Sequence, residues 1–169
     1  MLRLTFLGTS SSRPTVRRNV SAIAVQREGE LFLFDCGEGT QRQMMRYGVG
    51  FSVREIFITH LHADHYLGLP GLLRTMSLQG REDELVVWGG PGSAGHLRDT
   101  VELGGDRLVF SVAIRELPPG EAVRYPGFAV EAFPVDHSPT SIGLALVEED
   151  RLGRFDVDRA RALGVLEGP

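Results

Sequence analysis

A short apolar run leads into a dense group of potential metal ligands, Thr59-His60-Leu61-His62-Ala63-Asp64-His65. Residues 55–59 are predicted to form a β-strand, and alternate side chains of an extended chain point to the same side. His60 and His62 therefore face one way where this strand ends. Imidazole nitrogens are ligands that zinc prefers, so the junction is predicted to hold a metal ion.

Two further ligands follow directly. Asp64 and His65 lie at the turn into a predicted helix at residues 66–78, from which a carboxylate and another imidazole can face the histidine pair. A solvated, histidine-rich turn is the alternative interpretation. It is disfavoured because three of the five histidines of the chain fall within six residues at a strand end.

Length and composition indicate one globular domain. The chain has 169 residues, 42% of them hydrophobic, and 21 glycines, which predicts a compact, turn-rich α/β or α+β fold. The net charge of −4 and the pI of about 5.7 give no overall sign of nucleic-acid binding, so that function would need a local basic patch.

Cysteine usage and hydropathy predict where the protein works. Cys36 is the only cysteine, so no disulfide can form within the chain and a reducing compartment is expected. The first residues lack the pattern of a signal peptide, and no stretch approaches membrane-spanning length. The protein is therefore expected to be soluble and cytoplasmic.

Periodicity and turn residues predict the remaining elements. Strands are expected at residues 2–7, 21–26, 30–35, 85–88, 108–116, 122–125, 128–134 and 141–148, and helices at residues 41–47, 93–103 and 156–163. The strands at 21–26 and 30–35 should form an antiparallel hairpin. The second of them is unbroken by polar residues at 31–34, which predicts burial on both faces.

Residues 8–19 form a predicted loop that is rich in small and cationic residues. Arg13, Arg17 and Arg18, together with backbone N–H groups of the loop, could bind phosphates. An ordinary solvated loop is equally compatible with the local sequence.

Three other polar residues stand at informative places. Asp35 ends the buried strand and either caps the next turn or holds a metal ligand through a hydrogen bond. The local sequence alone favours the cap, whereas in the predicted metal site Asp35 is expected to hold a ligand. His137 follows the strand at 128–134, so it is a second histidine at a strand terminus. His96 lies in the predicted helix at 93–103 and is expected to be a surface or core histidine rather than a ligand.

Residues 59–65 match the His-x-His-x-Asp-His motif of the metallo-β-lactamase superfamily, and other segments narrow the resemblance to ribonuclease Z (tRNase Z). That family is made of zinc-dependent endonucleases that remove the 3′ trailer from precursor tRNA. The segments are Phe6-Leu7-Gly8-Thr9-Ser10, Pro14 through Arg18-Asn19, Phe34-Asp35-Cys36-Gly37-Glu38, Gly68-Leu69-Pro70-Gly71-Leu72-Leu73 and Gly164 through Glu167-Gly168-Pro169. The resemblance extends over residues 2–169, with Leu166 where the family usually carries proline.

The resemblance implies a metal site with two zinc ions. Residues His60, His62 and His137 would bind the first ion, while Asp64 and His65 would belong to the second, with Asp64 also activating the attacking water. Three imidazoles and an open position are the layout of a catalytic zinc site.

The resemblance also implies partners and a fold. It favours phosphate contacts between a tRNA end and the loop of Arg13, Arg17, Arg18 and Asn19, and it implies a homodimer. The fold would be a four-layer αβ/βα sandwich of two similar halves.

One departure concerns what the chain lacks. No histidine follows His137, so the late ligand and the proton donor of the family are missing, and Asp150, Asp156 and Asp158 lack the strand-end context of the bridging ligand. The expectation is a truncated ribonuclease Z, with residues 1–148 forming the first half and 149–169 the start of the tRNA-binding arm. At most one tightly held zinc ion and impaired cleavage are expected.

Two alternatives remain. The same fold could hydrolyse small phosphodiesters, or the chain could be a non-catalytic half-domain that acts as a binding or dimerisation module. The intact ligands argue against the second alternative. So does the apolar sheet face that half a sandwich would leave uncovered.

Overall fold

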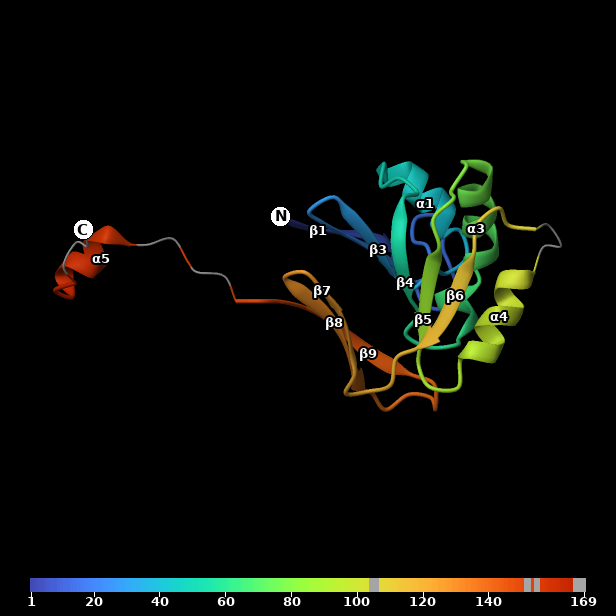
Figure 1. Ribbon diagram of the computed structural model, residues 1–169. Coiled ribbons are helices and arrows are strands. Elements are labelled where there is room, and N and C mark those ends of the chain that lie inside the picture. Colours follow the sequence, from blue (N-terminus) through green and yellow to red (C-terminus); the bar gives the residue numbers. More distant parts are fainter. Residues whose placement is uncertain (104–106, 151–152, 154–155, 166–169) are drawn as a thin grey trace.

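The computed structural model describes residues 1–103, 107–150, 153 and 156–165. Within these residues the chain forms a six-stranded sheet, in the order β1-β2-β3-β4-β5-β6, and a three-stranded sheet, in the order β7-β8-β9. Helices cover one face of the larger sheet, and the smaller sheet packs on its other face (Figure 1). The strands are β1 (Leu2–Gly8), β2 (Ala22–Arg27), β3 (Glu30–Phe34), β4 (Val53–Phe57), β5 (Leu85–Gly89), β6 (Val112–Glu116), β7 (Ala122–Tyr125), β8 (Phe128–Pro134) and β9 (Ile142–Glu148). The helices are α1 (Thr40–Tyr47), α2 (Ala63–Tyr66), α3 (Leu69–Leu78), α4 (Ala94–Glu102) and α5 (Val157–Ala162).

Strand β3 lies between two hydrophobic cores. It pairs antiparallel with β2, which confirms the predicted hairpin, and parallel with β4. Leu31 and Leu33 point into the core beneath the helices, whereas Phe32 points into the core shared with the smaller sheet. Since alternate side chains of a strand point to opposite faces, this confirms the predicted burial of the strand on both sides.

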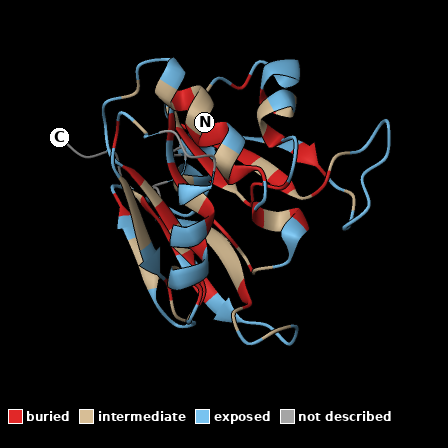
Figure 2. Cartoon of the chain, turned by 90° about the vertical axis from the view of Figure 1, so that its right-hand side faces the viewer, coloured by how far each residue is buried: buried red, intermediate tan, exposed pale blue. Residues whose placement is uncertain are grey.

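Aromatic rings fill the core between the sheets. Phe57 of β4 is fully buried and stacks on Phe34 of β3, with ring centroids 5.2 Å apart. Phe32 makes edge contacts with Tyr125 and Phe128 of the smaller sheet. Figure 2 shows that the buried residues follow the strands and the inner faces of the helices.

The predicted helix at 66–78 is wrong in one respect, because α2 and α3 are separate helices. Gly68 lies between them, and its N–H donates to the carbonyl of Cys36 over 2.8 Å. A Cβ atom on Gly68 would collide with the backbone of Gly37, so this glycine permits a close crossing of two chain segments. The crossing brings α2 against the end of β3.

Other boundaries differ by a few residues. Strand β4 ends at Phe57 rather than at residue 59, and β6 begins at Val112 rather than at 108. Ahead of β6, Phe110 is buried in the core, and the N–H of Val109 donates to the Ser77 hydroxyl rather than to a strand. These contacts of Val109 and Phe110 take the place of the predicted strand pairing.

The C-terminal part of the described chain leaves the sheets. Helix α5 begins after Asp156, whose carboxylate accepts a hydrogen bond from the Arg159 N–H over 3.0 Å, as a helix N-cap does. Figure 1 shows α5 apart from both sheets. The predicted departure at Leu166 and the motif ending at Pro169 lie outside the described residues. In the part of the chain that the structure describes, no helix has the length and apolar character to cross a membrane.

Candidate metal centre

Three chain segments meet at one edge of the larger sheet. The parallel strands β3 and β4 end at this edge, and the segment after β8 reaches it from the smaller sheet. The carbonyl of Thr59 accepts a hydrogen bond from the N–H of Ile142 over 2.9 Å, which ties the chain after β4 to the start of β9. Side chains from distant positions therefore gather here.

His60, His62 and His137 converge at this edge. Nε2 of His60 lies 3.0 Å from Nδ1 of His62, which in turn lies 3.2 Å from Nε2 of His137. One ligand atom from each residue lies within 4.8 Å of the others. His60 is buried, while His62 and His137 are exposed at the mouth of the cluster.

This donor set fits a divalent cation. A tetrahedral zinc ion with nitrogen ligands at about 2.0–2.1 Å separates the nitrogens by roughly 3.3 Å, close to the two contacts above. The pKa of His60 is lowered to about 4, mainly by burial and in part by repulsion from His65. His60 is therefore neutral near pH 7, and a neutral imidazole offers a nitrogen lone pair to a metal.

Asp64 and His65 lie beside the three histidines, on α2. Oδ2 of Asp64 is 3.5 Å from Nε2 of His65, and the ring of His65 lies 3.9 Å from that of His60, measured between centroids. The Ser12 hydroxyl donates to Oδ1 of Asp64 over 3.3 Å. A cavity of about 390 Å³ is lined by these five ligand candidates together with Ser21 and the residues Thr9 to Ser12.

Asp35 orients this group rather than capping a turn. Its Oδ2 accepts hydrogen bonds from Nδ1 of His65 over 2.6 Å and from the Ser21 hydroxyl over 2.8 Å. Its Oδ1 accepts from the N–H and the hydroxyl of Thr59, so among the described residues the carboxylate bonds Thr59, Ser21 and His65 instead of the turn that follows. The cap that the local sequence favours is therefore not formed, and Asp35 instead bonds a predicted metal ligand, His65. The cause is the backbone at Asp35, whose φ of 60° turns the chain sharply.

The environment of His65 shifts its pKa. Burial by itself lowers that pKa, but the hydrogen bond and negative charge of Asp35, together with the charge of Asp64, outweigh burial and raise it above the ordinary value. His65 is thus held in a strongly anionic surrounding.

Sequence reasoning missed Thr59. Its hydroxyl oxygen lies 2.9 Å from Oδ1 of Asp35, 3.0 Å from Nδ1 of His60 and 3.3 Å from Nδ1 of His65. The only signal in the sequence is a hydroxyl residue directly before the histidine motif. A single threonine at a strand end does not reveal which side chains it will meet.

The cationic loop lies next to the cavity. Arg13, Arg17 and Arg18 are exposed, and the Thr15 hydroxyl accepts hydrogen bonds from the N–H groups of Arg17 and Arg18 over 3.3 and 2.9 Å. The side chain of Asn19 donates to the Glu38 carbonyl over 2.7 Å, which anchors the loop.

His96 lies away from the cluster. It is exposed on α4, and its Nε2 lies 2.7 Å from the hydroxyl of Tyr66. The sequence predicts a surface or core histidine at this position, and the structure confirms that His96 lies at the surface.

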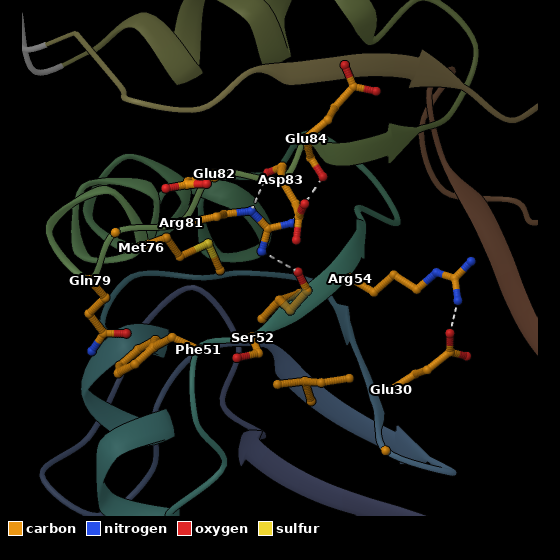
Figure 3. A pocket seen from close by; sticks show the side chains of 14 residues that line it. Glu30, Phe51, Ser52, Arg54, Met76, Gln79, Arg81, Glu82, Asp83 and Glu84 are labelled. Atoms are coloured by element: carbon orange, nitrogen blue, oxygen red, sulfur yellow. Dashed lines mark hydrogen bonds and ion pairs between the residues drawn. The ribbon is translucent and has the colours of Figure 1, made fainter.

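A larger hollow, of about 680 Å³, lies at the opposite edge of the sheet, where β3, β4 and β5 begin (Figure 3). Arg81 spans it and donates to the carbonyls of Val53, Asp83 and Glu84 over 2.7, 2.8 and 3.1 Å. Arg54 forms an ion pair with Glu30 at its rim. The lining contains no histidine among its described residues. The five ligand candidates line the smaller cavity instead.

Residues 2–154 match the family model described as "Anti-Pycsar protein Apyc1". The chain belongs to this family. The resemblance to ribonuclease Z is also confirmed, since this member of the family is 55% identical to the ribonuclease Z of Gemmatimonas aurantiaca, over 99% of this chain and 54% of that protein. The identity to the ribonuclease Z of Myxococcus xanthus is 53%, over 100% of this chain and 55% of that protein. The chain thus spans about half the length of these relatives.

Solved structures confirm the fold of this family member. The short form of human tRNase Z is 37% identical, with a TM-score of 0.76, over 88% of this chain and 65% of that one. The metallo-β-lactamase fold protein YhfI from Bacillus subtilis is 17% identical, with a TM-score of 0.72, over 86% of this chain and 58% of that one. The predicted metallo-β-lactamase type of α/β fold is therefore confirmed.

Proposed function

We propose that this chain carries the metal-binding half of a zinc-dependent endoribonuclease that removes the 3′ trailer from precursor tRNA. The observation that carries the proposal is the convergence of His60, His62 and His137, whose nitrogens approach one another at 3.0 and 3.2 Å. The identity of about half to the ribonuclease Z relatives supports tRNA as the substrate. The domain boundaries belong to the proposal, with residues 1–148 as the metal-binding unit and 149–169 as the start of an arm.

Five residues would hold the metal. His60, His62 and His137 would bind one zinc ion, and Asp64 and His65 would offer ligands to a second. Bound zinc supplies Lewis-acid polarisation of the phosphate group under attack. The second position has fewer ligands within the chain, so we expect one tightly held zinc ion.

The protein groups around these ligands assist the reaction. The Asp64 carboxylate is buried and held by Ser12 at Oδ1, so its Oδ2 is the atom placed to accept a proton from the attacking water. Asp35 holds His65 through the 2.6 Å hydrogen bond and so keeps the Nε2 of His65 beside Asp64.

The cationic loop provides a place for the substrate. Arg13, Arg17 and Arg18 are exposed in the loop whose residues Ser10, Ser11 and Ser12 line the cavity, so this loop would offer cationic groups to a phosphate backbone that enters it. Asn19 would contribute by anchoring this loop. We place the protein in the cytoplasm, because it carries a single buried cysteine, and we propose a homodimer on the resemblance alone.

The test combines metal binding with cleavage. Zinc is titrated into the chain against a chromogenic chelator, and the same preparation is incubated with a precursor tRNA. We expect one tight zinc ion per chain and weak cleavage at the 3′ trailer. Absence of tight zinc would refute the proposal, and two tight ions with rapid turnover would refute the single-ion expectation.

A chromogenic phosphodiester distinguishes the alternatives. Hydrolysis of this small substrate without cleavage of precursor tRNA would assign the chain to small phosphodiesters. Zinc-free, monodisperse and cooperatively melting protein would instead favour a binding or dimerisation module.

A further inference from the structure

We propose that Thr59 is a positioning residue. Its hydroxyl links Asp35 to His60 by hydrogen bonds and so fixes the His60 ring in the tautomer that presents Nε2 to the metal. The inference deepens the proposed metal site and rests on it for its functional meaning. The hydrogen bonds that support the inference are present in this chain without a metal ion.

The first step is the direction of the bonds at Asp35. Oδ1 receives the N–H and the hydroxyl of Thr59, both over 2.9 Å, and Oδ2 receives the Ser21 hydroxyl and Nδ1 of His65. An ionised carboxylate can only accept hydrogen bonds, and here each oxygen accepts two. The hydroxyl proton of Thr59 therefore points at Oδ1.

The second step follows from the single proton of a hydroxyl group. Because the Thr59 hydroxyl donates to Asp35, it can only accept from Nδ1 of His60, which lies 3.0 Å away. Nδ1 must then carry the imidazole proton. In a neutral imidazole this leaves Nε2 as the acceptor, and Nε2 is the atom that faces His62.

The same carboxylate acts on a second ring. His65 donates from Nδ1 to Asp35 over 2.6 Å, which places its Nε2 3.5 Å from Oδ2 of Asp64. One carboxylate thus orients His65 directly and His60 through the Thr59 hydroxyl. The two halves of the proposed metal site share one hydrogen-bonding centre.

The backbone holds Thr59 in place for this task. Its N–H is bound to Asp35, and its carbonyl accepts from Ile142 over 2.9 Å. Asp35 has a φ of 60°, a strained conformation for a residue with a side chain, and its N–H donates to the Phe57 carbonyl over 2.8 Å. Both partners of the Thr59–Asp35 bond are therefore anchored from outside the metal site.

The experiment reads the tautomer of His60 directly. Long-range ¹H–¹⁵N correlation spectra of the metal-free chain, at one pH near neutrality, distinguish a protonated ring nitrogen from an unprotonated one. The variants are Thr59→Val, which keeps the shape and the backbone bonds but lacks the hydroxyl, and Thr59→Ser, which keeps the hydroxyl. The matched control is Thr100→Val, because the buried Thr100 hydroxyl bonds the His96 carbonyl over 2.8 Å on α4.

We expect the parent chain, Thr59→Ser and Thr100→Val to carry the His60 proton on Nδ1. Thr59→Val should shift the proton towards Nε2, which imidazole in water prefers. Zinc binding by Thr59→Val should weaken by about 10–100-fold, as loss of a partner behind a metal-ligating histidine does. Binding by Thr59→Ser should stay within a few fold of the parent chain.

Two results would overturn the inference. One is an Nε2-protonated His60 in the parent chain, which can be read even if Thr59→Val does not fold. The other is a folded Thr59→Val with unchanged tautomer and zinc affinity. A parent chain that has the expected tautomer but binds no zinc would instead contradict the proposed function.

Discussion

Nδ1 of His65 and Oδ2 of Asp35 are joined by a 2.6 Å hydrogen bond that links the end of β3 to helix α2. The two residues come from segments that cross where Gly68 and Gly37 allow close backbone contact. The N–H of Cys36 donates to the carbonyl of His65 over 2.7 Å and strengthens the same junction. Metal site and fold therefore depend on each other at this point.

Replacement of Asp35 by Asn should lower the pKa of His65 in the metal-free chain. Asp35 raises that pKa, and the variant loses its charge and leaves mainly the effect of burial, which lowers it. In the parent chain, the pair stabilises the fold fully below the pKa of unfolded histidine, about 6.5. This stabilisation is lost as the pH rises through the raised pKa of His65.

The ring-proton shifts of His65 followed against pH, and the free energy of unfolding of both proteins, check this prediction. Glu38→Gln is the control, because Glu38 is an exposed acid in the same loop. An unchanged His65 titration in Asp35→Asn would contradict the assigned cause.

Replacement of His137 by Ala should weaken zinc binding strongly. The affinity should fall by more than the roughly 10–100-fold that is lost when a residue hydrogen-bonded to a metal ligand is removed. The reason is that one of three converging nitrogens disappears, while His60 and His62 remain 3.0 Å apart. His96→Ala is the matched control, since His96 is another exposed histidine whose partner is Tyr66. Chelator competition measures both affinities, and equal losses in the two variants would rule out this ligand set.

The thiol of Cys36 should resist modification in the folded chain. Burial raises its pKa to about 12, so almost no thiolate exists at pH 8. A chromogenic disulfide reagent should react with Cys36 rapidly only after denaturant unfolds the chain. Stoichiometric reaction within seconds under native conditions would show that the loop after β3 opens readily.

Replacement of Phe57 by Ala should destabilise the fold by about 3–5 kcal/mol, the usual cost of removing a large buried aromatic side chain. Phe57 is fully buried between the two sheets, where it stacks on Phe34 and Trp88. Leu78→Ala is the control, because Leu78 is 89% exposed at the end of α3. Urea unfolding measures both changes, and a loss below 1 kcal/mol for Phe57→Ala would show that the sheets are not packed as described.

Strand β1 carries exposed apolar side chains on one face. Leu2, Leu4 and Phe6 alternate along this edge strand and are 40%, 52% and 58% exposed. Alternation in the sequence predicts that they share a face, because the period of a strand is two. Their exposure could be seen only once the smaller sheet was placed, since that sheet covers the face at β3 and β4.

The sequence by itself determined the order of the elements, the burial of strand β3 and the position of the histidine motif directly after β4 in the chain. These features are local, because periodicity, turn residues and apolar runs act over a few residues. Even so, the break at Gly68 and the late start of β6 depend on packing against distant segments. The sequence pattern predicted a continuous helix across Gly68 and began the later strand too early.

Only the tertiary structure decided how the site is assembled. It brought His137 to within 3.2 Å of His62, although 75 positions separate them in the chain. It also made Asp35 the partner of Thr59 and His65 rather than the cap that the local sequence favours. Such contacts depend on backbone turns and sheet packing that no local pattern records. The left-handed backbone at Asp35 is the clearest physical reason, because it aims a carboxylate into the site instead of at the next turn.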